Sequence, residues 1–186
     1  MRITGGHSKG RRLGPLKGLR IRPSSDKVRE AIFNLIGQDI TGLNVLDLFS
    51  GTGSLGIEAL SRGASWALFI DNSLQAITLI KKNLSLCHYD RAGAVLKKDL
   101  RRGLPLRHGL MKNKFGLVFI DPPYGKGLIP PVLSELSEKN TLAPSSIVIA
   151  ETSKSDTLPD SIGKLHFMNA KIYGETRLNI YYYGEE

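Results

Sequence analysis

The 186-residue sequence lacks disulfide-forming cysteines, membrane-length apolar runs and metal-ligand clusters. Its one cysteine, Cys87, cannot form an internal disulfide, which fits a reducing compartment. No apolar run approaches the ~20 residues that a membrane span requires, and the glycine-rich start lacks the apolar core of a secretory signal. The four histidines show no ligand spacing and have no cysteine cluster beside them. We therefore expect a cytoplasmic protein that uses no membrane and no metal.

Negative charge is also scarce. The chain has 17 acidic against 26 basic residues, a formal net charge of +9. The imbalance is largest in the first thirty residues, where nine Lys or Arg face only Asp26 and Glu30. Such a concentration attracts polyanions by releasing their counterions, so nucleic acid is the expected partner; a solvated basic tail is the alternative. The side chains expected to bind it are Arg2, Lys9, Arg11, Arg12, Arg20, Arg22 and Arg29.

The length and the 41% hydrophobic content indicate one substantial core with a small appendage. Five glycines interrupt residues 1–22, which predicts a basic N-terminal arm or small β-hairpin there. A main domain is then expected over residues 23–186. Its first helix should begin near residues 24–26, which supply an N-cap and a first-turn acid before apolar residues at helical spacing.

Short apolar runs alternate with amphipathic stretches along the rest of the chain. The runs predict buried strands at 44–49, 66–70, 94–96, 117–120 and 147–150. Helices are expected at 55–61, at 74–84 and from Pro130 onward. Continuous apolar strands in a βαβαβ order predict a doubly wound, Rossmann-like α/β sheet with helices on both faces. Segments 165–173 and 177–183 flank a Gly-Glu turn, which indicates a C-terminal antiparallel hairpin at the sheet edge.

A glycine-rich turn, Gly51-x-Gly53-x-x-Gly56, joins the first predicted strand to the next helix. Glycines there let backbone approach a ligand and let the helix pack tightly, although the pattern alone also fits a dinucleotide site or a merely tight turn. Asp71, twenty positions past Gly51, ends the next strand where a carboxylate can accept both hydroxyls of a ribose. A nucleoside-containing cofactor is therefore expected.

Asp47 separates the two candidate cofactors. A carboxylate at this strand end suits a cationic sulfonium ligand and would repel a pyrophosphate, so S-adenosylmethionine is favoured over a nicotinamide dinucleotide. Asp99 is placed to accept a hydrogen bond from an adenine amino group, with a solvated loop acid as the alternative. The residues predicted to bind the cofactor are Asp47, Ser50, Gly51, Thr52, Gly53, Asp71, Asn72, Asp99 and Leu100.

The most specific motif is Asp121-Pro122-Pro123-Tyr124, which ends the fourth predicted strand. A double proline cannot continue a central strand, so the chain must leave the sheet rigidly at its carboxyl edge. The amino group of a base is a poor nucleophile and must be aligned by fixed acceptors. The Asp121 carboxylate and the Pro122 carbonyl can supply these acceptors, and Tyr124 can stack on a base flipped out of its helix. The alternative is a strand-ending turn with a capping Asp and a packed Tyr.

These residues resemble a known family. Met1-Arg2-Ile3-x-Gly5-Gly6, Gly10-Arg11, the segment Arg22-Pro23 to Glu30, the 47–58 turn, Ala59 to Arg62 and the 121–124 motif are together similar to the RsmD family. Its members are bacterial guanine-N2 methyltransferases of small-subunit (16S) ribosomal RNA. The similarity spans nearly the whole chain and is weakest beyond Glu151.

The resemblance implies a methyltransferase domain with an N-terminal β-hairpin, acting on ribosomal RNA in a partly assembled small subunit. It also implies that Asp47, Gly51, Gly53 and Asp71 hold S-adenosylmethionine while residues 121–124 hold the guanine. We expect a monomer. The alternatives are adenine-N6 methylation of DNA or RNA, glutamine methylation of a protein, a noncatalytic RNA-binding assembly protein and a nicotinamide dehydrogenase.

Overall fold

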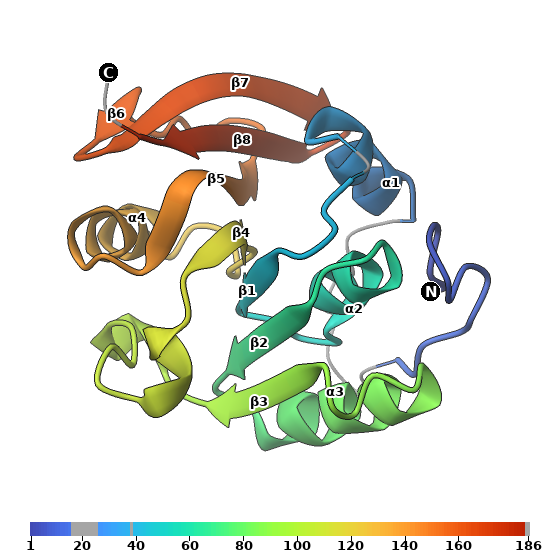
Figure 1. The fold of residues 1–186 in the computed structure, drawn as a ribbon. Helices are drawn as coiled ribbons and strands as arrows, with labels where there is room; N and C mark the ends of the chain where they lie inside the picture. Colours follow the sequence, from blue (N-terminus) through green and yellow to red (C-terminus); the bar gives the residue numbers. More distant parts are fainter. Residues whose placement is uncertain (16–25, 38, 185–186) are drawn as a thin grey trace.

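The computed structural model describes residues 1–15, 26–37 and 39–184 (Figure 1). Its helices and strands follow the predicted alternation. The helices are α1 (Asp26–Leu35), α2 (Ser54–Ser61), α3 (Leu74–Leu86) and α4 (Ile129–Glu138), with short 3-10 turns at Leu100–Arg102 and Gly109–Lys112. The strands are β1 (Asn44–Leu48), β2 (Trp66–Asp71), β3 (Gly93–Lys97), β4 (Phe115–Ile120), β5 (Leu142–Ser153), β6 (Ser161–Ile162), β7 (Leu165–Tyr173) and β8 (Thr176–Tyr183).

The strands form one sheet in the order β3-β2-β1-β4-β5-β8-β7-β6. The first five are mutually parallel, whereas β8 runs antiparallel to β5 and pairs with β7 as a hairpin. This confirms the Rossmann-like class and the C-terminal hairpin. The β5 strand is longer than predicted, because its polar first half still pairs with β4 through a register shift between Phe115 and Leu117.

Two apolar layers cover the sheet. One layer contains Phe33 of α1, Ile57 of α2 and Ile80 of α3, which pack against Phe69 and Phe119 of the sheet. The other layer contains α4 and the two 3-10 turns, which pack on the opposite face of the strands. Figure 1 shows the same division, with α4 on the far side of the sheet from α2 and α3. Each large apolar side chain buried in this way stabilises the fold by roughly 1.5–3 kcal/mol.

The strand order places the switch point of the sheet between β1 and β4. The chain moves from β1 toward β2 and β3 on one side, and β4 and β5 lie on the other. Ligands of such sheets bind beyond the carboxyl ends of the strands at this point. The residues found there are Asp47, Asp71, Asp121 and Glu151, each within the last residues of its strand or directly after it.

The N-terminal arm folds back on the main domain as a small antiparallel loop. Arg2 and Arg12 form a bridge, and the Ile3 N–H donates to the Arg11 carbonyl at 3.0 Å. Ile3 and Leu13 are buried in the same apolar layer as α1 and α2. The arm is therefore charged, as predicted, and it is also anchored to the main domain by apolar contacts. Its end at residue 22 and the expected helix cap at residues 24–25 lie outside the described residues.

None of the helices in the described part of the chain meets the length and hydropathy that a membrane span needs.

Candidate active site

The glycine turn follows β1 with three residues of left-handed backbone. Phe49 has φ 59°, Gly51 has φ 54° and Gly53 has φ 75°. A Cβ on Gly51 would meet nothing closer than 3.9 Å, so its backbone faces open space at the sheet edge. A Cβ on Gly56 would lie 2.3 Å from a Phe69 ring carbon, so the helix could not pack this closely with any other residue. The two predicted functions of these glycines, ligand approach and helix packing, are thus divided between Gly51 and Gly56.

Asp47 lies beneath this turn and is 1% exposed. Its Oδ2 accepts the Gly56 N–H at 2.9 Å. Burial raises the pKa of Asp47 to about 8; the Gly56 N–H opposes this rise, and the negative charge of Asp71 adds to it. No described Lys or Arg forms an ion pair with this carboxylate. A ligand cation beside it would favour its ionised form, which fits the sulfonium and ammonium groups of S-adenosylmethionine.

Asp71 ties the turn to β2. One carboxylate oxygen accepts the Gly51 N–H at 2.9 Å, and the other accepts the Ser73 N–H at 2.9 Å. Each oxygen retains acceptor capacity for a ribose hydroxyl. Ser50 also joins the two strands, since its buried hydroxyl donates to the Asp47 carbonyl and accepts the Ile70 N–H. These hydrogen bonds fix the turn against the ends of both strands.

The remaining predicted cofactor residues differ in accessibility. Thr52 is buried and Asn72 is exposed. Leu100 packs in the apolar layer beside α4. The Asp99 carboxylate accepts hydrogen bonds from Arg101 at 2.7–3.2 Å, and these bonds lower its pKa to about 2. An adenine amino group would have to share Asp99 with that guanidinium.

The Asp121–Tyr124 motif leaves the sheet directly after β4. The Asp121 N–H approaches the Leu48 carbonyl at 3.4 Å, which places the motif beside the end of β1 and the glycine turn. On its other side, Pro122, Pro123 and Tyr124 line a cavity of about 490 Å³ together with Glu151 and residues 152 and 155–158 of the segment after it. Such a volume is in the range of small-molecule sites.

Tyr124 is anchored at its hydroxyl while part of its ring remains accessible. The hydroxyl donates to Glu151 Oε1 at 2.7 Å and lies 3.0 Å from Thr176 Oγ1. Burial raises the pKa of Tyr124, and the charges of Glu151 and Asp121 add to the rise, so the hydroxyl keeps its proton. The side chain is 39% exposed. This arrangement combines the predicted aromatic surface with a fixed orientation.

The predicted nucleic-acid residues divide into three groups. Arg2, Lys9, Arg11 and Arg12 are exposed on the arm. Arg20 and Arg22 lie outside the described residues. Arg29 is wrongly predicted as a nucleic-acid contact, because its side chain is fully buried. Its guanidinium donates instead to Asp26 Oδ1 at 2.8 Å and to the Arg2 carbonyl at 2.6 Å.

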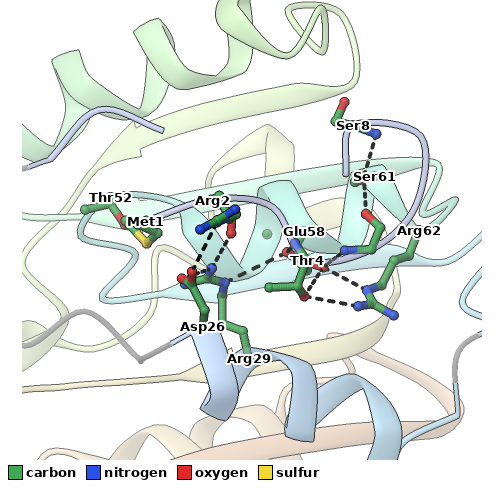
Figure 2. A network of polar contacts seen from close by, with 12 residues as sticks. Met1, Arg2, Thr4, Ser8, Asp26, Arg29, Thr52, Glu58, Ser61 and Arg62 are labelled. Carbon is green, nitrogen blue, oxygen red and sulfur yellow. Dashed lines mark hydrogen bonds and ion pairs between the residues drawn. The ribbon is translucent and has the colours of Figure 1, made fainter. Parts of the chain in front are cut away.

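Glu58 of α2 is the centre of the polar network that holds the arm (Figure 2). This fully buried carboxylate accepts the Thr4 N–H at 2.8 Å, the Gly5 N–H at 2.7 Å and Arg62 Nε at 3.0 Å. Arg29 Nε lies 3.9 Å from its second oxygen. The sequence assigns Glu58 no role. The signal that could have drawn attention to it is a charged residue inside a short helix whose other seven positions are all neutral and small or apolar.

Asn83 of α3 connects the arm to the cofactor turn and was also missed. Its Oδ1 accepts the Gly14 N–H at 2.9 Å, and its Nδ2 donates to the Thr52 carbonyl at 2.9 Å. The Thr52 hydroxyl also lies 3.9 Å from the sulfur of Met1. Met1, at the start of the arm, therefore contacts Thr52 directly, and Gly14, at its end, is connected to Thr52 through the Asn83 side chain.

The fold and this site together define the class of the protein: it is a Rossmann-like methyltransferase. The model of the family described as "Conserved hypothetical protein 95" matches residues 1–182, and the chain belongs to that family. The resemblance to the RsmD family is thereby confirmed.

Individual relatives match over almost the full chain. The chain is 37% identical over 183 residues to "Putative rRNA methyltransferase YlbH" of Bacillus subtilis (strain 168), an alignment that covers 97% of this chain and 98% of that one. It is 29% identical over 185 residues to "Ribosomal RNA small subunit methyltransferase D" of Escherichia coli (strain K12), covering 97% and 89%. The solved structure "Putative methyltransferase yhhF from Escherichia coli" superposes with a TM-score of 0.84 at 28% identity, covering 100% of this chain and 99% of that one.

Proposed function

We propose that the protein transfers a methyl group from S-adenosylmethionine to the exocyclic N2 amino group of a guanine in small-subunit ribosomal RNA. The observation that carries the proposal is the position of Asp121–Tyr124 between the glycine turn and the 490 Å³ cavity. A base in that cavity would present its amino group to Asp121 on the side of the cofactor turn. The ribosomal substrate is supported by the names of relatives that match nearly the whole chain.

The cofactor, when bound, supplies an activated methyl group on a sulfonium, so neither a metal nor a covalent cysteine is needed for the transfer. Asp47 beneath the turn would balance its positive charge, and Asp71 would accept its ribose hydroxyls. The chain thus contributes binding and alignment rather than a nucleophile of its own.

Alignment of the acceptor nitrogen falls to the motif. The Asp121 carboxylate and the Pro122 carbonyl accept the two amino N–H groups, which turns the nitrogen lone pair away from the base ring and toward the methyl donor. When the methyl group leaves the sulfonium, which becomes a neutral thioether, the Asp121 carboxylate would take the proton that the nitrogen loses. Because neither proline has an N–H, no backbone donor at these positions competes for the acceptors. The accessible part of the Tyr124 ring holds the base by stacking, a contact worth ~1–3 kcal/mol.

RNA binding is proposed for the exposed arginines and lysine of the arm. Their charge would attract the phosphate backbone and release counterions, while Glu58 and the buried Ile3 keep the arm in a fixed place relative to the cavity. We further propose that the RNA is methylated within a partly assembled small subunit, and that the enzyme is a monomer located in the cytoplasm.

The proposal is tested by transfer of labelled methyl from S-adenosylmethionine to small-subunit particles that lack the modification, with free RNA and DNA as controls. Nucleoside analysis identifies the product. Label in N2-methylguanosine is expected. Label in N6-methyladenine would favour the adenine-directed alternative, and no label in any acceptor would favour a noncatalytic binding protein.

A further inference from the structure

We infer that Glu151 is a specificity-determining residue, which selects guanine by accepting a hydrogen bond from its ring N1–H. The inference rests on the proposed function, since it assigns a role in the base cavity of that same site. Sequence reasoning gave Glu151 no part in the site.

Glu151 stands next to Asp121 at the carboxyl edge of the sheet. Ile120 of β4 and Ala150 of β5 are paired in register, so the residues that follow them, Asp121 and Glu151, are neighbours across the two strands. Side chains alternate along a strand, so both lie on the sheet face of Phe119 and Ile149 rather than that of Ile120 and Ala150. Glu151 also lines the cavity alongside Pro122 and Tyr124. Glu151 thus borders the base-sized space, and Asp121, which directly precedes the lining residue Pro122, is its neighbour across the two strands.

Two hydroxyls hold the Glu151 carboxylate in a defined orientation. Tyr124 donates to Oε1 at 2.7 Å, and the Thr176 hydroxyl donates to the same oxygen at 3.3 Å. The residue is only 8% exposed. A carboxylate offers about four acceptor positions on its two oxygens, so it can accept from a base donor as well as from the groups that orient it. Hydrogen-bonded carboxylates of this kind are already oriented before a base arrives, which favours discrimination.

The pair of carboxylates matches guanine and mismatches adenine. Guanine carries adjacent donors on its Watson–Crick edge, the N1–H and the N2 amino group, and a flipped base is read on that edge. Asp121 would accept from the amino group while Glu151 accepts from N1–H. Adenine carries an amino group beside a bare ring nitrogen, whose lone pair would face the Glu151 carboxylate without a proton between them. A site built around such a hydrogen bond rejects an analogue without the donor by as much as roughly 10⁴-fold.

The test uses 2-aminopurine, which keeps the 2-amino group but has no hydrogen on N1. Small-subunit particles are assembled from RNA that carries either guanine or 2-aminopurine at the methylated position, and kcat/KM is measured for each. The wild-type enzyme should prefer guanine by roughly 100-fold or more. Glu151→Gln should lower that preference at least tenfold, because the glutamine amide can donate to the bare N1 and still accept from N1–H.

Three variants separate base recognition from support of Tyr124. Tyr124→Phe removes the hydroxyl that contacts Glu151, and it should keep the guanine preference even if it lowers turnover. Glu138→Gln changes an exposed acid of α4 that does not line the cavity, and it should change neither value. Glu151→Asp keeps the carboxylate and should retain part of the preference. Equal loss of preference in Tyr124→Phe and Glu151→Gln would reduce Glu151 to a support for the tyrosine and overturn the inference.

If Glu151→Gln does not fold, the wild-type data can still overturn the inference, because similar rates on guanine and 2-aminopurine would contradict any recognition of N1–H, and Glu151→Asp then supplies the variant comparison. Failure of the proposed function has a different signature. In that case the wild-type enzyme transfers no methyl to the guanine substrate, whereas failure of this inference leaves guanine methylated and the preference independent of residue 151.

Discussion

The side-chain amide of Asn83 donates a hydrogen bond to the backbone carbonyl of Thr52 at 2.9 Å, and this contact ties helix α3 to the cofactor turn. The other end of the same amide accepts the Gly14 N–H of the arm. Asn83 is fully buried. The part of the chain proposed to bind RNA and the part proposed to bind cofactor therefore share one side chain.

Asn83→Ala should destabilise the protein by about 2–4 kcal/mol, because it leaves the Gly14 N–H and the Thr52 carbonyl without this buried partner. Cofactor affinity should fall as well, since the turn loses a support. Denaturant unfolding and calorimetric titration with S-adenosylmethionine measure the two effects. Gln75→Ala, an exposed site on the same helix, is the matched control and should change both by little. Equal unfolding free energies and equal cofactor affinities of the two variants would show that the Asn83 amide supports neither the fold nor the cofactor turn.

Glu58→Ala should release the N-terminal arm from α2. The substitution removes the acceptor of two arm N–H groups and leaves the guanidinium groups of Arg29 and Arg62 without their buried carboxylate partner. Removing one member of a buried ion pair costs about 3–5 kcal/mol. Hydrogen exchange should show faster exchange of the Thr4 and Gly5 amides. Glu138→Ala on α4, whose carboxylate is exposed, should leave these amides protected.

The buried Asp47 should make cofactor binding depend on pH. Its pKa of about 8 means that the carboxyl group holds its proton at lower pH, whereas a cationic ligand favours the ionised form. Affinity for S-adenosylmethionine should therefore rise between pH 6 and 7.5, by up to about tenfold per pH unit. Titration at several pH values tests this. Asp47→Asn should bind weakly and with little pH dependence; a wild-type affinity that stays flat would contradict the account.

The same group affects stability with a definite sign. In the unfolded chain the Asp47 carboxyl ionises near its ordinary value of 3.8, whereas in the folded protein it does so near 8. The folded state thus binds more protons between these values, so the contribution of Asp47 to stability falls as pH rises from about 4 to 8. The free energy of unfolding of Asp47→Asn, measured by denaturant, should therefore rise relative to that of the cofactor-free wild type as pH increases over that interval. A relative stability of Asp47→Asn that falls with pH would refute the assignment.

Charge reversal across Arg11, Arg12 and Arg22 should weaken RNA binding in a salt-dependent way. The binding constant falls as salt rises, and each lost phosphate contact should make the slope of log K against log salt concentration shallower by about 0.7–0.9. Binding is measured by fluorescence anisotropy at several salt concentrations. The control is Lys139→Glu at the C-cap of α4, a helix that Figure 1 shows on the opposite side of the molecule from the arm; it should leave the slope near the wild-type value. An unchanged affinity and slope in the triple variant would remove the arm from the RNA interface.

Much of the fold could be predicted because its signals are local. The apolar runs that became β1, β2 and β4 are continuous, as expected for strands buried on both faces, and Gly51 and Gly53 stand where the backbone has positive φ. The Asp121–Pro122–Pro123 motif ends β4 as the prolines require. Each of these expectations depends on neighbouring residues in the sequence alone.

The errors and omissions depend on contacts between distant segments. Arg29 reads in the sequence as a surface cation, and its burial is explained by the Arg2 carbonyl and Glu58, which reach it from other segments. Asn83 lies on a helix like many polar residues, and its two backbone partners are 31 and 69 positions away. Glu151 meets Tyr124 across 27 positions. Periodicity and spacing carry no information about such pairs.

The central claim is that Asp121 aligns a guanine amino group for methylation, and Asp121→Ala tests it most directly. Small-subunit RNA from cells that lack the gene is digested to nucleosides, and N2-methylguanosine is quantified by mass spectrometry after complementation with the wild type or the variant. The account predicts that the wild type restores one N2-methylguanosine per particle, whereas Asp121→Ala restores none although the purified variant still binds S-adenosylmethionine. Full restoration by Asp121→Ala, or an unaltered N2-methylguanosine content without the gene, would contradict it.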